Sequence, residues 1–211
     1  MSKRRLAIRV ILAAVILGSA AFFVYTRFFV WMVRVPTGAM LNTIVPGDRL
    51  VVHRLFGNPN RGDIVAFQYP GDQAYYITRI IGLPGESIQL KGKLVYINGR
   101  PIAEQRVLVD PRYNGKEPLQ ELSTEGSGPY RVYYVKHSFE EDEMSSGMSG
   151  DFGVETPFQI PNDSYFLMGD NRDNSEDSRY RGPVPRNLIW GKPSIVYYSE
   201  SNSDRAFTKV Q

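Results

Sequence analysis

The sequence contains no cysteine and only two histidines, His53 and His137, among its 211 residues. The absence of cysteine excludes disulfide scaffolds, Cys-ligated zinc, iron–sulfur clusters and thiol catalysis. Two histidines far apart in the sequence are typical of isolated surface or core positions and form no metal-binding cluster. We therefore expect neither a metal nor an organic cofactor.

Acidic residues are missing from the first nine positions, which carry four basic ones: Lys3, Arg4, Arg5 and Arg9. Without those four, the chain has 21 basic and 22 acidic residues, so the net charge of +3 belongs to the N-terminal flank. The remaining chain lacks the positive excess of a nucleic-acid-binding domain, and we expect no nucleic-acid partner.

A long charge-free run, Val10–Thr26, follows the basic flank and is bracketed by Arg9 and Arg27. Its 17 residues are near the minimum for a helix that spans a bilayer, and the apolar character continues to Val33. Interfacial aromatic residues are expected next to such a helix, and this chain has Tyr25, Phe28, Phe29 and Trp31. The basic flank predicts a cytoplasmic N-terminus, with everything after Arg27 outside.

A cleaved secretory signal is the alternative interpretation of this segment, because Gly18-Ser19-Ala20-Ala21 supplies small residues after an apolar stretch. Apolar residues resume at once with Phe22-Phe23-Val24, where a cleavable signal normally turns polar. We therefore favour an uncleaved membrane anchor. The expected organisation is a cytoplasmic flank at 1–9, an anchor with its interfacial segment at 10–33, and an extracytoplasmic domain at 34–211.

Beyond the anchor, short β-type runs alternate with turn residues. The composition favours a mainly β fold, with 13 Tyr and 11 Phe. Asn98-Gly99 between two extended runs predicts a hairpin. The other expected strands are Arg49–Phe56, Asp63–Tyr69, Tyr75–Ile81, Ser87–Leu90, Arg131–Val135, Ser164–Met168 and Ser194–Tyr198.

Two polar segments, Val107–Pro129 and Glu140–Thr156, are rich in Gly, Ser, Glu and Pro and are expected to be loops. They would belong to a β-rich subdomain inserted at about 91–160. The predicted architecture is a partly open β-barrel that carries this insertion, behind one N-terminal transmembrane helix.

Four segments carry most of the chemical information. They are Val35-Pro36-Thr37-Gly38-Ala39-Met40, followed by Pro46-Gly47-Asp48; Arg61-Gly62-Asp63-Ile64-Val65; Tyr76-Ile77-Thr78-Arg79 running into Gly82-Leu83-Pro84-Gly85-Glu86; and Gly169-Asp170-Asn171-Arg172-Asp173-Asn174-Ser175-Glu176-Asp177-Ser178-Arg179-Tyr180. Singly, most are ordinary turn sequences. In this order, behind an anchor, they resemble the bacterial type I signal peptidases over nearly the whole chain.

The resemblance implies a serine peptidase that uses a Ser/Lys dyad to remove signal peptides from secreted preproteins. Both catalytic positions differ here. Ala39 occupies the position of the nucleophilic serine, and Thr78 occupies that of the lysine general base. Alanine has no atom that attacks a carbonyl, and threonine does not accept a proton near neutral pH. Asn42 is a lesser departure, at a position where many members have proline.

Other positions match the family. The Thr37 hydroxyl and the Ala39 backbone N–H match the oxyanion-hole donors. Ser175 matches a serine that orients the lysine, while Asp177 and Arg179 match a supporting ion pair. A structural role for these last three fits the residues equally well, because a polar loop beside a groove needs such bonds in any case.

Two functions from different classes follow. The chain is either an inactive homologue that still binds signal peptides, with membrane lipid and an active relative as further partners, or an active membrane-bound endopeptidase. The second interpretation applies if the sequence is a deliberately disabled variant of an active enzyme. It also applies if the nucleophile or base is relocated, and the candidates are then Thr37, Thr43, Lys91 and Lys93. A second loss at Thr78 favours natural divergence over engineering. A self-cleaving regulator of the LexA type is disfavoured, since an anchor precedes the β domain where a DNA-binding segment would stand.

Overall fold

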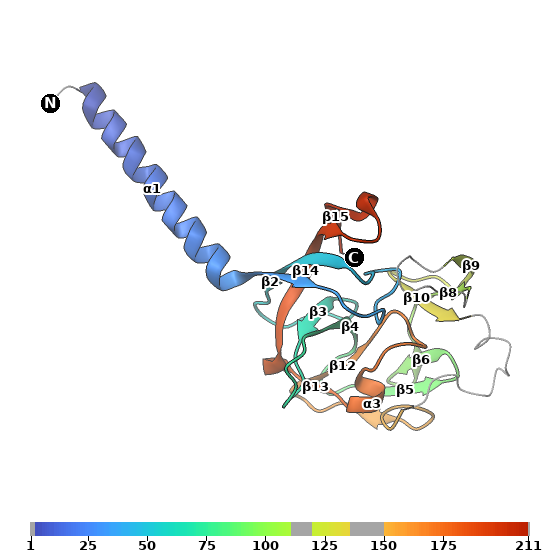
Figure 1. Cartoon of the computed structure of the whole chain (residues 1–211). Coiled ribbons are helices and arrows are strands. Elements are labelled where there is room, and N and C mark those ends of the chain that lie inside the picture. Colours follow the sequence, from blue (N-terminus) through green and yellow to red (C-terminus); the bar gives the residue numbers. More distant parts are fainter. Residues whose placement is uncertain (1–2, 111–119, 136–149, 211) are drawn as a thin grey trace.

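The computed structural model describes residues 3–110, 120–135 and 150–210 (Figure 1). The N-terminal helix α1 (Lys3–Phe29) projects from a β-rich body. Its stretch Ala7–Phe29 has a mean hydropathy of 2.4 and buries no side chain inside the protein, so its length and composition suit a membrane span. Only near its end does the helix meet the body, where the Phe29 and Phe56 rings lie 5.7 Å apart between centroids in the described structure.

The largest sheet has eight strands and forms the body next to α1 (Figure 1). Its order is β1-β2-β14-β3-β4-β12-β13, with β15 paired to β14. The bounds are β1 Val30–Arg34, β2 Asp48–Arg54, β3 Ile64–Phe67, β4 Tyr76–Gly82, β12 Ser164–Met168, β13 Val184–Pro185, β14 Ile189–Ser199 and β15 Thr208–Lys209. Strand β1 follows α1 directly and lies at the edge of this sheet, paired with β2.

Two smaller sheets lie between β4 and β12 in the sequence. One has the order β10-β8-β9, and the other has the order β11-β5-β6-β7. The bounds are β5 Ser87–Lys91, β6 Leu94–Ile97, β7 Arg100–Pro101, β8 Gln105–Val109, β9 Glu121–Glu125, β10 Arg131–Val135 and β11 Phe158–Gln159. Three short helices complete the described fold: α3 Ser178–Arg181, η1 Arg186–Leu188 and η2 Ser203–Arg205.

The hydrophobic cores join these sheets into one body. Ile81 of β4 and Phe166 of β12 are buried in the same cluster as Ile88 and Leu90 of β5. The segment after β1 shares a second cluster with β8 and β10 through Leu41, Val45, Val107, Val109 and Tyr133. The sheet that contains β8 and β10 therefore packs against residues 41–45, and the sheet that contains β5 packs on the main sheet.

The mainly β class with an apolar N-terminal helix is confirmed. The Asn98-Gly99 hairpin is confirmed too, with Ile97 paired to Arg100. The loop expected at Val107–Pro129 is wrong in part, because β8 extends to Val109 and β9 (Glu121–Glu125) pairs with it. All five side chains of β9 are exposed, so the strand is formed by its backbone pairing with β8. Its sequence therefore has no apolar periodicity from which the strand could be predicted.

Two other boundaries require comment. The strand expected at Ser194–Tyr198 begins earlier, at Ile189, and passes through Pro193 in the interior of the sheet. A register shift next to Pro193 accommodates the residue that cannot donate to the ladder. Of the polar segment Glu140–Thr156, residues 140–149 lie outside the described residues, and Val154 makes an isolated bridge with Leu90.

Candidate functional site

A hollow of about 390 Å³ lies where the segment after β1 meets the start of β4. Its lining consists of residues 33–40, Ile44, residues 74–78, Asn174 and Glu176. Ala39, Thr78 and Thr37, which are far apart in the sequence, thus face one cavity; we call it the Ala39 pocket. Among the residues that the structure describes, no lysine or histidine is part of its lining.

The segment that carries Thr37 and Ala39 is held from both ends. The Val35 N–H donates to the Asp48 carbonyl, and the Asp48 carboxylate accepts from the Val45 N–H at 2.9 Å. Arg205 adds an ion pair to Asp48 at 2.7 Å. Within this segment Asn42 has a φ of 37°, which asparagine tolerates and the fixed ring of proline does not. The substitution at Asn42 therefore agrees with the backbone shape found here.

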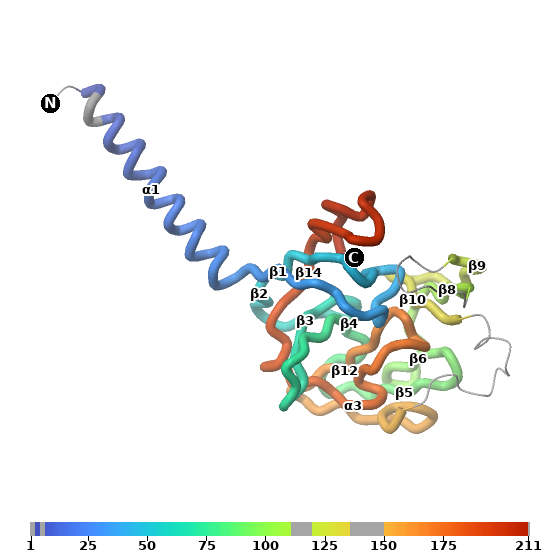
Figure 2. Tube along the Cα trace, in the orientation of Figure 1, coloured from blue at the N-terminus to red at the C-terminus, as the bar shows by residue number. Residues whose placement is uncertain are grey.

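The loop after β12 packs directly on Ala39, as Figure 2 shows for the blue segment after β1 and the orange segment after β12. The Asn171 N–H donates to the Ala39 carbonyl at 3.0 Å, and the Asn171 side-chain amide donates to the Gly38 carbonyl at 2.9 Å. A Cβ at Gly169 would lie 2.4 Å from the Ala39 carbonyl oxygen and 2.3 Å from Ser175 Oγ. Only glycine fits there, and Ser175 Oγ and the Ala39 carbonyl are close neighbours.

Thr78 and Ser175 are both buried, with 2% and 8% of their surfaces exposed. Neither hydroxyl has a hydrogen-bond partner within the described part of the chain. Buried hydroxyls are rarely left unpaired, because each loses its bonds to water without a replacement. Thr78 lines the Ala39 pocket, and Ser175 lies beside the Ala39 carbonyl, so both unpaired hydroxyls belong to the surroundings of the same segment.

The two donors that the resemblance assigns to an oxyanion hole are unoccupied. Across residues 3–110, 120–135 and 150–210, neither the Thr37 hydroxyl nor the Ala39 N–H makes a hydrogen bond. Thr37 is exposed and Ala39 is half-buried, so both donors are accessible from the cavity. Both groups could therefore donate hydrogen bonds to a carbonyl or carboxylate oxygen that enters the Ala39 pocket.

Asp177 and Arg179 form a fully buried ion pair with two bonds of 2.8 Å. Asp177 also accepts from the Gly169 N–H at 2.9 Å, and Arg179 donates to the Arg172 carbonyl at 2.8 Å. Burial alone would lower the pKa of Arg179, but the adjacent Asp177 charge outweighs it and the pKa is raised. The pair thus braces the loop that carries Ser175.

Sequence reasoning missed a second buried pair. Arg79, next to Thr78, binds Asp170 through two bonds of 2.8 and 2.7 Å, and Thr43 donates to the same carboxylate at 2.6 Å. Burial opposes the charge of Arg79, and Asp170 more than compensates, so the pKa of Arg79 is raised. Both residues stood in the quoted motifs, but their pairing spans 91 positions and has no local signal.

The other candidate groups lie elsewhere or are already engaged. Lys91, the last residue of β5, lies over the Tyr96 ring, and Lys93 lies over the Tyr134 ring. His53 belongs to β2, while His137 falls outside the described residues. Thr43 is bound to Asp170. In the described residues no group of three or more His, Cys, Asp or Glu side chains is placed to hold a metal ion.

Comparison with known proteins gives these features a family. The chain matches the model of the family "Signal peptidase, peptidase S26" over residues 5–198. It is 32% identical to a signal peptidase I of Pseudomonas aeruginosa over 204 residues, covering 83% of this chain and 67% of that protein. A signal peptidase I of Bacillus amyloliquefaciens is 30% identical over 189 residues, covering 88% and 82%.

A solved structure of a signal peptidase I from Enterococcus faecalis is 26% identical, with a TM-score of 0.38, and covers 65% of this chain and 98% of that one. The match over residues 5–198 includes all four motif segments and the elements that build the Ala39 pocket. The chain therefore belongs to the bacterial type I signal peptidase family, peptidase S26.

Proposed function

We propose that this protein binds signal peptides of secretory preproteins without cleaving them. The observation that carries the proposal is the lining of the Ala39 pocket, which among the described residues combines two free oxyanion-type donors with no lysine and no histidine. A methyl group stands at Ala39, and the hydroxyls of Thr78 and Ser175 are buried without partners in the described structure. Such a site can hold a peptide carbonyl, but it lacks a nucleophile at Ala39 and an amine base at Thr78, and its carboxylate, Glu176, is exposed.

Strand β1 supports a mode of binding. It pairs with β2 along one edge and has no second strand partner in the described fold. An extended peptide that adds to this edge would satisfy the free backbone groups of β1 and run beside the Ala39 pocket. Small side chains suit this pocket, whose volume of about 390 Å³ is near the lower limit for ligand sites.

We further propose that α1 anchors the chain in the bacterial inner membrane, with Lys3, Arg4, Arg5 and Arg9 in the cytoplasm and the β-rich body outside. The charge asymmetry across α1 supports this orientation. Membrane lipid would surround α1, and an active signal peptidase is a further partner of this proposal. Substrates would then reach the Ala39 pocket from the bilayer in which α1 lies.

The binding test uses the full chain in neutral detergent and an extended peptide with small residues at the two specificity positions. We expect weak but measurable binding by isothermal titration, and weaker binding by Ala39→Val, whose branched side chain enters the pocket. Ala103→Val, at an exposed position away from the pocket, is the matched control. Absence of binding at about 1 mM peptide would contradict the proposal.

The cleavage test uses the same chain on a preprotein. Oxyanion donors and binding alone accelerate hydrolysis by ~10³–10⁴ over water, which an ordinary assay does not detect. Ala39→Ser or Thr78→Lys alone should stay silent, since each lacks its partner. The double variant should cleave after a small residue, because the orphaned Ser175 hydroxyl then has a lysine to orient. Cleavage by the unmodified chain would refute the inactive assignment.

An active peptidase with a relocated nucleophile is the second candidate, and the partnerless, exposed hydroxyl of Thr37 favours it. Against it, the described lining offers no lysine or histidine to deprotonate that hydroxyl, and its carboxylate, Glu176, is exposed and lies 3.9 Å from Arg181. If the unmodified chain does cleave, Thr37→Val should abolish the activity, while Thr43→Val should leave a nucleophile at Thr37 in place.

A further inference from the structure

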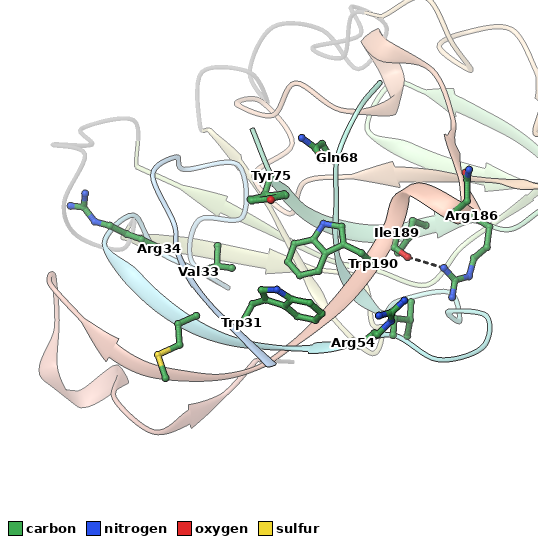
Figure 3. A pocket seen from close by; sticks show the side chains of 12 residues that line it. Trp31, Val33, Arg34, Arg54, Gln68, Tyr75, Arg186, Ile189 and Trp190 are labelled. Atoms are coloured by element: carbon green, nitrogen blue, oxygen red, sulfur yellow. Dashed lines mark hydrogen bonds between the residues drawn. The ribbon is translucent and has the colours of Figure 1, made fainter. Parts of the chain in front are cut away.

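A second and larger cavity, of about 860 Å³, is lined in part by residues 31–34, which follow α1 closely (Figure 3). We call it the Trp190 pocket; Trp31, which helps to form it, is the second residue after α1. Its volume is within the range of small-ligand and side-chain binding sites. The residues that define its character are Trp31, Arg34, Arg54, Tyr75, Arg186 and Trp190.

Three aromatic rings form the interior of this pocket, as Figure 3 shows. The Trp190 ring meets Trp31 at 5.2 Å and Tyr75 at 5.3 Å between centroids, both edge to face. Such rings offer apolar surface and favourable geometry to a further aromatic or large aliphatic side chain. In the described part of the chain, the lining includes three arginines and no acidic residue, so a cationic side chain is disfavoured there.

The two cavities are adjacent. Val33, Arg34 and Tyr75 line both of them, so the Trp190 pocket and the Ala39 pocket lie one after the other along the segment from Trp31 to Ala39. Trp31 and Val33 both pack against the core cluster that contains Val35, which places the three on one face of the strand. A peptide added to the free edge of β1 would therefore pass the Ala39 pocket and the Trp190 pocket in turn.

We propose that the Trp190 pocket is a second subsite for the same peptide, which receives one large apolar or aromatic side chain N-terminal to the small residues beside Ala39. This inference rests on the proposed peptide binding. The direction of the bound peptide follows from the direction of the chain. Strand β1 (Val30–Arg34) begins directly after α1, and Ala39 comes five residues after its end. A peptide whose apolar N-terminal part lies in the same bilayer as α1 enters from the same side and runs parallel to β1.

The spacing follows from strand geometry. Trp31 precedes Val35 by four residues, or about 13 Å at the rise of a strand. The large side chain should therefore stand about four to six residues before the small residue nearest Ala39. Because successive side chains of a strand point to opposite faces, the effect should alternate along the peptide.

The test scans one phenylalanine along the segment N-terminal to the small residues, with the unmodified full chain in neutral detergent. We expect about a tenfold gain in affinity at the favoured position, and little at the positions directly before and after it. Lysine at the favoured position should bind less well than alanine. Phenylalanine placed C-terminal to the small residues is the matched control and should give no gain.

Tryptophan fluorescence provides a direct readout, because Trp31 and Trp190 are the chain's two tryptophans and the peptides contain none. Peptides with phenylalanine at the favoured position should change the emission more than the short peptide does. Trp190→Ala should remove the tenfold gain and leave the affinity for the short peptide unchanged. A melting curve checks that this variant folds, and the peptide scan on the unmodified chain does not depend on it.

The outcomes separate the two proposals. If the short peptide does not bind, peptide binding itself fails. If the short peptide binds but the scan is flat, or the gain survives in Trp190→Ala, the second subsite is wrong. The subsite is also overturned if brominated phospholipid in nanodiscs quenches both tryptophans and peptide gives no protection, because the pocket is then occupied by lipid.

Discussion

At the scale of single residues, Thr78 and Ser175 are the buried groups of the Ala39 region that lack partners. Both keep hydroxyls for which the described residues offer no hydrogen-bond partner. The ion pairs around them are formed, since Asp177 binds Arg179 and Asp170 binds Arg79. Intact ion pairs around the Ala39 pocket are what the proposed binding role requires.

The buried pair of Arg79 and Asp170 makes a prediction about stability. Their side chains are 3% and 1% exposed, so Asp170→Asn would leave the arginine charge buried without a counter-ion. We expect a loss of about 3–5 kcal/mol in the free energy of unfolding, measured by denaturant titration. The exposed pair Arg131–Glu121 is the control, where Glu121→Gln should cost about 0–1 kcal/mol. Equal losses in the two variants would contradict this account.

At the scale of elements, a polar cluster ties α3 to the loop between β3 and β4. Arg181 of α3 lies 4.1 Å from the centre of the Tyr69 ring and donates to the Tyr76 hydroxyl at 2.7 Å and to Asp72 at 3.2 Å. Tyr76 also lines the Ala39 pocket. The cluster therefore positions one wall of the pocket from an element that follows it by about a hundred residues in the sequence.

This cluster predicts a pH dependence. The hydrogen bond from Tyr76 is the main cause that lowers the pKa of Asp72 to about 2, from an ordinary value of 3.8. A depressed carboxyl pKa stabilises the fold fully above the ordinary value, and that contribution disappears as the pH falls through the folded-state value. The Tm advantage of the unmodified chain over Asp72→Asn should thus shrink between pH 3.8 and about 2.

Differential scanning calorimetry across that range measures the effect. Tyr76→Phe removes the main donor to Asp72 and is the matched variant; its Tm difference from the unmodified chain should shrink over the same interval. A Tm difference that stays constant with pH would mean that Asp72 has no depressed pKa in the folded chain.

At the scale of the whole molecule, an apolar helix of membrane-spanning length is joined directly to an edge strand of the body. Because β1 begins at the residue after α1, the proposed insertion of α1 into a bilayer would hold the edge of the main sheet and the pockets beside it near the membrane surface. That arrangement suits ligands that are themselves attached to the bilayer.

The topology gives a prediction for the intact chain. The four basic residues before α1 should hold the N-terminus in the cytoplasm. An alkaline phosphatase reporter fused after Gln211 should therefore be active outside, and the protein should stay in membranes after an alkaline carbonate wash. Recovery of a soluble, N-terminally shortened form would support the cleaved-signal interpretation instead.

Much of this protein follows from its sequence alone, because local patterns specify local structure. The charge-free run predicted the helix, short β-type runs between turn residues predicted most strands of the main sheet, and Asn98-Gly99 predicted its hairpin. The proposal that Ala39 and Thr78 replace a serine and a lysine likewise rests on single residues within the sequence motifs. By contrast, β9 escaped prediction because its pairing with β8 depends on a neighbour and not on its own side chains.

Only the tertiary structure decided which distant residues meet. It paired Arg79 with Asp170, set Asn171 on the carbonyls of Gly38 and Ala39, and brought Trp31 against Trp190. Each of these contacts joins segments separated by more than ninety positions, and no periodicity or turn signal extends so far along a chain. Burial of side chains and the pairing of distant strands select such partners, so the two pockets exist only in the folded molecule.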